Sequence, residues 1–397
     1  MLSVRLTQSM VNSMSLTKIQ LIFKHGFPKY FENHRLSSQQ LKASNSIMKC
    51  KTGTLGVHVS VCDECGSLNF HNSSCRNRNC PNCQAVLKEI WIDMRSSEMI
   101  DSRYYHVVFT LPYQLNSLIY CNQALLYDLM HKASAQTLLE LSANLKYLGA
   151  TPGIIQVLHT WGQELNFHPH IHCIVSGAGL TKAKELKTTG KSFFIPAKVL
   201  AAKFKGKFLD KLNRLYTEKK LFFSEAVSYL ADENEWYRFK DKLYNTQWVP
   251  DIRETLNGQG NAIAYLGRYA NRIAITNSRI VDVNEETVTF KAKDYRDNSR
   301  MKEVTIPNEE FVRRFLMHVL PKGFQKIRYY GYLSNRFKKS NLKIMFAIQG
   351  KRLYESKLSG LSIPEVLKEV WDYNIYQCRH CGSMSMRLLG HSYHMRE

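Results

Sequence analysis

The chain has 397 residues, of which 44% are hydrophobic, so it is long enough for two or three domains with a substantial core. No apolar run has membrane-spanning length and residues 1–20 lack the apolar stretch of a secretory signal, so we expect a cytoplasmic protein with no membrane partner. The 55 Lys and Arg residues against 33 Asp and Glu leave a net charge of +22. That excess favours nucleic acid as the partner, because each contact between a basic side chain and a phosphate releases condensed counterions.

The amino-terminal segment, residues 1 to about 48, carries apolar residues at near-helical spacing in "IQLIFKHGFPKYFENH". Gly26 and Pro28 interrupt this pattern, because glycine weakens a helix and proline lacks the backbone N–H. The segment therefore predicts a short helical lead-in that is broken at these two residues.

A block of cysteines follows, with six of the ten cysteines of the chain in residues 50–83. In a reducing compartment such clustering indicates metal rather than disulfides. Two C-x-x-C pairs, separated by fourteen residues, predict one structural Zn²⁺ site with the ligands Cys62, Cys65, Cys80 and Cys83. The substitute ligands are Cys75, His71 and, with a weaker case, Cys50. The alternative is an unligated reduced cluster, but this segment has too few large aliphatic residues to fold on apolar burial alone.

Basic residues accompany the cysteines. Arg76, Arg78 and Lys88 lie within or just after the block. We expect the zinc-binding segment to contact DNA through them, because arginine and lysine supply most contacts to nucleic-acid phosphates.

The next segment alternates apolar and polar residues, which is typical of strands. "YYHVVFTLP" predicts a strand from residue 104 that ends at Pro112, with a helix following to about residue 147. "GIIQVLHTW" (153–161) and "FHPHIHCIVSGAG" (167–179) predict two further strands. The short link "GQELN" between these two fits an antiparallel hairpin.

Histidines on these two strands indicate a metal site. Side chains of a strand alternate between its faces, so His170 and His172 project from the same face and can reach one cation. The hairpin brings His159 alongside as the third ligand, ahead of His168, which lies beside Pro169 at the strand entrance. The alternative is a chance pair of histidines on a solvated face.

Three neutral imidazoles leave a divalent ion its full charge and open coordination positions, which suit phosphate oxygens. By ligand preference, Mn²⁺, Co²⁺ or Zn²⁺ fits three nitrogens better than Mg²⁺. Oxygens from substrate and water would also make Mg²⁺ acceptable. We therefore expect Mg²⁺ or Mn²⁺ at this site, with phosphate oxygens completing its coordination.

Residues 181–257 are charged and irregular, and we interpret them as an insertion or subdomain with some helices. "TTGKSFF" within them contains Gly-Lys-Ser, but the preceding glycine of a P-loop would stand at position 185, which is Glu185. Any helicase activity would therefore have to come from a host partner.

A helix is predicted from about Asn261, and it carries paired tyrosines. Tyr265 and Tyr269 are four residues apart and so share a helix face, which Arg268 and Arg272 flank. A phenol is a weak nucleophile at neutral pH and needs a nearby cation. The alternative is that both tyrosines are core residues with their hydroxyls at the rim.

Gly267 lies between the two tyrosines and weakens the helix by about 1 kcal/mol relative to alanine. We hypothesise that it stands there because DNA must approach the backbone closely.

The remaining third of the chain shows no second nucleophile pattern. "AITNSRIVDV" and "TVTFKAKDY" predict a hairpin around Asn284 and Glu285, and "PNEEFVRRFLMHVLP" predicts a helix. "KIRYYGYLSNRFKK" predicts a last strand, whose tyrosines could stack unpaired bases or belong to the core. In the carboxy-terminal tail, a second zinc site could form from Cys378, Cys381, His391 and His394.

Three of these stretches, in this order, resemble the motifs of HUH endonucleases: "HVVFTLP", "VLHTWGQELNFHPHIHCIVSGAG" and "YLGRYANRIAITNSRI". They look most like those of the two-tyrosine, rolling-circle transposases of bacterial insertion sequences. "NSSCRNRNCPNCQ" resembles the amino-terminal zinc-binding domain of the same family, and "FLMHVLPKGFQKIRYYGYLSNR" its later segment.

The resemblance implies an α+β fold: an HUH nuclease domain with a central antiparallel sheet and flanking helices, preceded by a small zinc-binding domain. The expected divisions are a lead-in and zinc-binding domain (1–95), a nuclease domain (100–337, with the insertion near 181–257) and a basic tail (338–397).

The resemblance also implies a bacterial, DNA-associated enzyme that cleaves and rejoins single-stranded DNA. His170 and His172 carry over as the metal-binding pair with His159 as third ligand, and Tyr265 and Tyr269 as nucleophiles that form a 5′-phosphotyrosine. Two alternatives remain. A zinc-containing DNA-binding regulator would form no covalent adduct, and a histidine-triad nucleotide hydrolase would not need the tyrosines.

Overall fold

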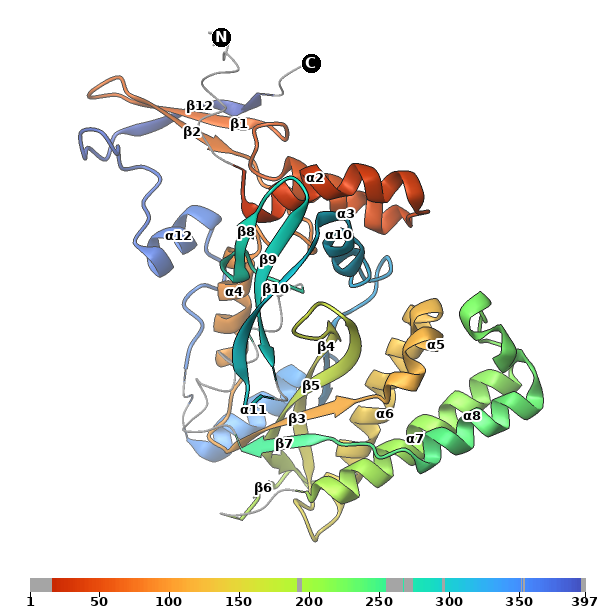
Figure 1. Cartoon of the computed structure of the whole chain (residues 1–397). Helices are drawn as coiled ribbons and strands as arrows, with labels where there is room; N and C mark the ends of the chain where they lie inside the picture. Colours follow the sequence, from red (N-terminus) through yellow and green to blue (C-terminus); the bar gives the residue numbers. More distant parts are fainter. Residues whose placement is uncertain are drawn as a thin grey trace.

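The computed structural model describes residues 16–190, 195–254, 267, 274–294, 297–350, 352 and 354–393, with the side chains of 253, 254 and 390–393 left out. Helices and antiparallel sheets both contribute, which confirms the α+β class (Figure 1). In these residues, no helix is both long enough and apolar enough to cross a membrane.

The central sheet has the strand order β11-β4-β5-β3-β7, and β6 pairs with β5. Its strands are β3 (Tyr104–Thr110), β4 (Thr151–Trp161), β5 (Phe167–Leu180), β6 (Leu186–Thr188), β7 (Asp251–Glu254) and β11 (Ile327–Gly331). All neighbouring strands are antiparallel. β5, which carries the H-x-H motif, lies between β4 and β3, so the prediction of a central histidine strand is confirmed.

The two faces of this sheet bury different cores. Ile171, Cys173 and Val175 of β5 belong to the larger core, which α5 (Asn116–Cys121), α6 (Gln123–Ala143), α7 (Ala197–Thr217) and α8 (Glu233–Asn245) complete. Ile174 and Ala178 face the opposite way, into a core shared with α4 (Ala85–Ser96) and α11 (Lys338–Gln349). Strand alternation puts His170 and His172 on this second face, the side of α4 and α11.

The expected insertion at 181–257 is instead part of the larger core. Phe204 and Phe208 of α7 and Trp236 of α8 are almost fully buried there, with a 3-10 turn, η2 (Glu225–Ala231), between the two helices. β7 pairs with β3 and adds an edge to the sheet. The sequence did not indicate that α7 belongs to the core, because lysines separate its apolar residues.

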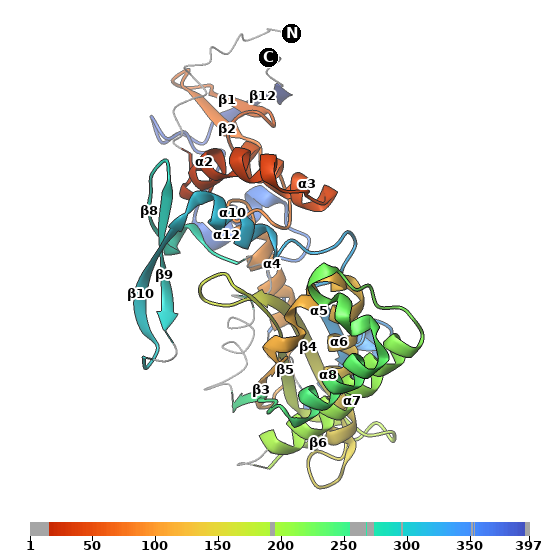
Figure 2. The same ribbon diagram turned by 45° about the vertical axis from the view of Figure 1, so that its right-hand side comes forward.

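A third core lies outside the central sheet. It joins the lead-in helix α2 (Lys18–Asn33) to α10 (Asn308–Leu316) and to the three-stranded sheet β10-β9-β8. The strands are β8 (Ile280–Val283), β9 (Thr287–Asp294) and β10 (Arg300–Pro307), with the 3-10 turn η3 (Asn277–Arg279) before β8 and η1 (Tyr113–Leu115) before α5. Figure 2 shows this sheet apart from the central one. The predicted hairpin around Asn284 is confirmed. The expected domain boundary near residue 95 does not separate two cores, because residues before it pack in one core with residues 274–319.

The lead-in helix is not broken where the sequence predicted. α2 runs through Gly26 and Pro28, and α3 (Ser38–Lys49) follows it. A Cβ on Gly26 would lie 2.5 Å from the backbone carbonyl of Asn308, at the start of α10. Glycine therefore stands there because two helices approach closely, which is a tertiary reason that helix propensity cannot reveal.

The carboxy-terminal region is also more than a basic tail. α11 packs on the histidine face of the central sheet through Leu342 and Met345, and α12 (Ile363–Trp371) contacts α4. β12 (Met386–Tyr393) pairs with β1 (Val57–Cys62), which pairs with β2 (Leu68–Asn72). The zinc-binding region is thus built from both ends of the chain, as Figure 1 shows for β1, β2 and β12.

Candidate metal and nucleic-acid site

The structure brings together the three histidines that the sequence singled out. His159 on β4 is the register partner of His170 on β5, and His172 lies two residues further along β5. One ring nitrogen from each of the three lies within 4.8 Å of the others. This donor set fits a divalent transition metal, because three neutral imidazoles from two strands enclose one side of an ion and leave the other side open.

Hydrogen bonds fix the orientation of two of these rings. Nδ1 of His170 donates to the backbone carbonyl of His168 at 2.7 Å, which leaves Nε2 as the nitrogen that can face a metal. Nδ1 of His172 lies 2.9 Å from Nε2 of His106 on β3. Such outer partners set the tautomer and orientation of metal-binding imidazoles. His168 therefore serves this site through its carbonyl.

His106 was not among the predicted site residues. The signal was present, because strand alternation puts His106 on the face opposite Val107 and Phe109. Strand β3 pairs with β5, with His106 opposite Ile174 and Val108 opposite His172. The sequence does not give this register, so the contact between His106 and His172 could not be derived from it.

Burial keeps the cluster neutral. His159 and His172 are only 2% and 7% exposed. Burial lowers the pKa of His170 to about 4, with nearby His168 contributing, and it lowers the pKa of His172 well below its usual value. At neutral pH His170 and His172 are therefore in the unprotonated form that binds metal.

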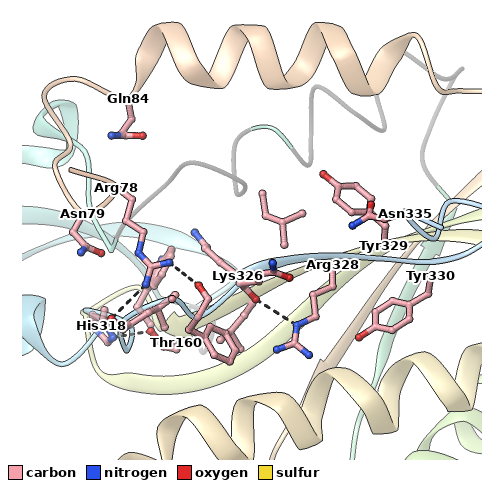
Figure 3. Close-up of a pocket in the computed structure, with 17 residues that line it drawn as sticks. Arg78, Asn79, Gln84, Thr160, His318, Lys326, Arg328, Tyr329, Tyr330 and Asn335 are labelled. Atoms are coloured by element: carbon pink, nitrogen blue, oxygen red, sulfur yellow. Dashed lines mark hydrogen bonds between the residues drawn. The ribbon is translucent and has the colours of Figure 1, made fainter. Parts of the chain in front are cut away.

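A pocket of about 680 Å³, shown in Figure 3, is connected to this cluster through Trp161, although none of the three histidines lines it. The Trp161 ring stacks on His159 with centroids 4.4 Å apart, and it also lines the pocket. Nζ of Lys326 lies 5.0 Å from the centroid of Trp161. Burial, with a further effect of Arg78, lowers the pKa of Lys326 to about 7. The pocket thus offers a cation and an aromatic ring beside the histidines.

The two predicted DNA-binding arginines of the cysteine block differ. Arg78 lines the pocket and donates to the carbonyls of Phe324 at 2.6 Å and Pro321 at 2.9 Å. It therefore ties the cysteine block to the segment before β11, as Figure 3 shows beside Lys326. Arg76 is exposed and has a left-handed backbone, with φ of 51°.

The tyrosines in and just after β11 differ in their burial and contacts. Tyr332 is 1% exposed and belongs to the core on the histidine face. The hydroxyl of Tyr329 accepts hydrogen bonds from Trp91 at 3.2 Å and Arg95 at 2.9 Å, both on α4. Tyr329 therefore fastens α4 to β11 at the edge of the pocket.

The predicted nucleophiles Tyr265 and Tyr269 and their flanking Arg268 and Arg272 lie outside the described residues. Gly267, between the tyrosines, is described: it is helical and buried. A Cβ at this position would collide with the Ile92 side chain of α4. The space that we had reserved for DNA beside Gly267 is thus filled by a protein side chain.

The cysteines form two clusters, so the prediction that Cys62, Cys65, Cys80 and Cys83 share one site is wrong. The first cluster is Cys50, Cys75, Cys80 and Cys83, and the second is Cys62, Cys65, Cys378 and Cys381. The β1–β2 hairpin explains why these cysteines fall into two clusters. Val61 pairs with Leu68 near its turn and Val57 with Asn72 at its open end, so Cys62 lies at one end and Cys75 beyond the other.

The first cluster has the dimensions of a zinc–thiolate site. Its Sγ atoms lie within 4.8 Å of one another, with Cys75 and Cys83 at 3.7 Å. Four sulfurs about 2.3 Å from a tetrahedral Zn²⁺ are about 3.8 Å apart. Cys50 follows α3 and Cys83 precedes α4, so zinc here would join the lead-in helices to the helix that packs on the histidine face.

Comparison with known proteins agrees with this architecture. Residues 22–111 match the family described as "Transposase zinc-binding domain", and residues 153–341 match the family described as "Putative transposase". A protein of Sinorhizobium fredii named "Putative transposase y4qJ" is 40% identical over 80% of this chain and 81% of its own length. The "Transposase for insertion sequence element IS801" of Pseudomonas savastanoi pv. phaseolicola is 28% identical over 77% of this chain and 73% of its own. No solved structure matches. Both domain matches, together with a relative that is 40% identical over 80% of this chain, show the family. The chain belongs to the two-tyrosine transposases of bacterial insertion sequences that carry an amino-terminal zinc-binding domain.

Proposed function

We propose that this protein cleaves and rejoins single-stranded DNA at insertion-sequence ends by tyrosine transesterification, with a 5′-phosphotyrosine intermediate. The observation that carries the proposal is the cluster of His159, His170 and His172, whose ring nitrogens lie within 4.8 Å of one another, with the rings of His170 and His172 oriented by hydrogen bonds. Three imidazoles gathered in a largely buried place are costly for stability and suit a bound cation.

These three imidazoles would hold Mn²⁺ or Mg²⁺, which when bound supplies Lewis-acid polarisation of the scissile phosphate. The remaining chemistry belongs to the chain. The phenolic oxygen of Tyr265 or Tyr269 attacks phosphorus and forms a new P–O bond, while the bond to the 3′ oxygen breaks and that oxygen takes up a proton. One phosphodiester replaces another, so the step is reversible and strands can rejoin without ATP.

The position of Gly267 supports tyrosines on the metal side of the sheet. Gly267 lies against Ile92, and Ile92 packs on the core of the face that carries His170 and His172. Gly267 itself therefore lies on the same side of the sheet as the histidines. The opposite face is filled by α6, α7 and α8.

The pocket beside the histidines supports an unpaired strand as the substrate. Lys326 and Arg78 can neutralise phosphates, and Trp161 offers an aromatic face beside His159. Arg328 is neutralised by Asp128, at 2.6 Å, so it contributes less charge. Duplex DNA would need to be opened first, and we assign this strand separation to a host helicase. We place the protein itself in the cytoplasm, where it meets the DNA.

The test is formation of a covalent adduct. Purified protein is incubated with Mn²⁺ and single-stranded DNA from an element end, and a protein–DNA species that survives denaturation is sought on a gel. We expect the adduct with wild type, its loss in His170→Ala, and its loss in the double variant Tyr265→Phe/Tyr269→Phe.

Each alternative function has its own outcome in this experiment. An adduct that persists in the double tyrosine variant would overturn the assignment of the nucleophiles. Sequence-specific duplex binding without any adduct would identify a zinc-containing regulator. Nucleotide hydrolysis that survives both tyrosine substitutions would identify a histidine-triad hydrolase.

A further inference from the structure

We propose that Cys62, Cys65, Cys378 and Cys381 bind a second Zn²⁺ ion, which fastens the carboxy-terminal segment of the chain onto the amino-terminal hairpin. The matched zinc-binding domain ends at residue 111, so it does not include two of these four ligands. The site is thus separate from Cys50, Cys75, Cys80 and Cys83, and its ligands come from opposite ends of the sequence.

The sulfur positions fit zinc and exclude disulfides. Sγ of Cys62 lies 3.6 Å from Sγ of Cys381, and Sγ of Cys65 lies 3.7 Å from Sγ of Cys378. All four lie within 4.8 Å of one another. A tetrahedral zinc–thiolate site requires sulfurs about 3.8 Å apart, whereas a disulfide requires about 2.05 Å.

The two halves of the site are built alike. Each is a Cys-x-x-Cys-Gly turn, in "CDECG" and "CRHCG". The N–H of Gly66 donates to the carbonyl of Cys62 at 2.9 Å, and that of Gly382 to Cys378 at 3.0 Å. Both glycines have left-handed backbones, with φ of 69° and 74°. Two matching turns that present their sulfurs to each other are typical of a zinc ribbon, and glycine is needed at the left-handed position.

Polar groups around the sulfurs favour thiolates. The backbone N–H of His380 donates to Sγ of Cys378 at 3.4 Å. Oγ of Ser385 lies 3.4 Å from Sγ of Cys62. Such bonds to sulfur are the usual outer partners of zinc-bound cysteines, because they stabilise the negative charge on the ligand.

In the described residues, the surrounding sheet has a small apolar core. It consists of Val57, Val59 and the partly buried Phe70, with Met386 of β12 packed against Cys62 and Cys378. A three-stranded sheet with so small a core is marginal, and small modules of this kind are commonly stabilised by metal. β12 pairs with β1, and an exposed ion pair joins Arg387 to Asp63 at 3.0 Å, so zinc would add the strongest link between the two ends of the chain.

The two zinc sites should differ in lability. Cys65 and Cys381 are exposed, while Cys50 and Cys80 are 1% and 0% exposed. A chelator can therefore reach the second site first. Loss of that ion should release β12 and the segment before it, while the first cluster keeps its zinc.

The experiment measures zinc in the full-length protein by mass spectrometry. We expect Cys378→Ser/Cys381→Ser to hold one zinc ion fewer per chain than wild type, and the matched control Cys121→Ser to hold as many as wild type, because Cys121 belongs to neither cysteine cluster. The difference from wild type is the readout, because the histidine cluster can also bind zinc. Equal zinc contents in the double variant and wild type would overturn the proposal.

A second measurement needs no variant. Wild-type protein is titrated with a chelator, and zinc release is followed together with limited proteolysis. We expect the first ion released to coincide with new cleavage between α12 and β12, at residues 372–385. Release of the first ion without new cleavage there would show that this zinc does not hold the carboxy-terminal segment, and would overturn the proposal. Neither result depends on DNA cleavage, so both are independent of the proposed function.

Discussion

His106 and His172 face each other across neighbouring strands, with Nε2 of His106 2.9 Å from Nδ1 of His172. Their rings are nearly parallel, with centroids 5.1 Å apart and an angle of 12° between the planes. A neutral imidazole that binds metal through Nε2 carries its proton on Nδ1. With metal bound at Nε2, His172 would be the donor in this hydrogen bond and His106 the acceptor.

The first prediction concerns this acceptor. Replacing His106 by Leu removes the acceptor and frees the ring of His172 to rotate, so Mn²⁺ affinity should fall about 10- to 100-fold. His106→Gln offers an amide oxygen in its place and should retain most of the affinity. Calorimetric titration with Mn²⁺ alone measures both. Equal affinities for His106→Leu and wild type would show that His106 does not position His172.

The second prediction concerns Lys326 and pH. Its pKa is lowered to about 7, so the free protein carries a neutral amine at pH 9 and a charged one at pH 6. A phosphate nearby favours the charged form, so binding of single-stranded DNA takes up a proton. Affinity should be greatest at low pH and should fall by up to about tenfold per unit above pH 7.

Fluorescence anisotropy with a labelled oligodeoxythymidylate, without added Mn²⁺ or Mg²⁺, measures this slope. The protein for this assay carries Tyr265→Phe/Tyr269→Phe, so that binding is separated from cleavage. Adding Lys326→Arg provides the control, because arginine stays charged across this range and should flatten the profile. If both proteins show the same slope, Lys326 does not contact the strand.

Local patterns were sufficient to predict strands β3, β4 and β5 of the central sheet, but not β6 and β7. The alternation in β3, β4 and β5 and the stop at Pro112 gave strands close to those observed. The hairpin between β4 and β5 was enough to bring His159 to His170, because a short link leaves few registers. The grouping of the three histidines could therefore be predicted from the sequence.

The features that the sequence concealed depend on contacts between distant segments. The spacing of Cys62, Cys65, Cys80 and Cys83 resembled one zinc site, yet two of their partners are Cys378 and Cys381. Spacing reports only local ligand pairs, and the pairing of β1 with β12 decides which pairs meet. The same holds for α2, whose Gly26 is explained by α10 rather than by its own helix.

The third prediction concerns the packing of Gly267 on Ile92. Gly267→Leu improves helix propensity by roughly 0.8 kcal/mol but places a large side chain against Ile92, and overpacking costs about 1–3 kcal/mol. We expect lower thermal stability and a reduced adduct yield. Adding Ile92→Ala restores the space and should recover part of both. If Ile92→Ala does not relieve the effect of Gly267→Leu, the two residues are not in contact.

The fourth prediction concerns acid stability and His318. This ring is 2% exposed; its Nδ1 lies 3.1 Å from Oγ1 of Thr160, and its Nε2 donates to the carbonyl of Leu165 at 3.0 Å. Burial lowers its pKa to about 4. Because the unfolded chain then binds the proton more readily, the stability contributed by the neutral ring is present above pH 6.5 and is lost as pH falls toward 4.

Over that window the loss amounts to about 3 kcal/mol, from a shift of roughly 2.5 pKa units at 1.36 kcal/mol each. His318→Gln keeps a donor for Leu165 and an acceptor for Thr160 but cannot be protonated. It should melt below wild type at about pH 7.5 and approach or exceed wild type at about pH 4.5, as followed by circular dichroism. Protonation of the zinc-binding cysteines affects both proteins equally, so the difference between their melting temperatures isolates His318. A difference that is the same at both pH values would show that His318 does not titrate in this window.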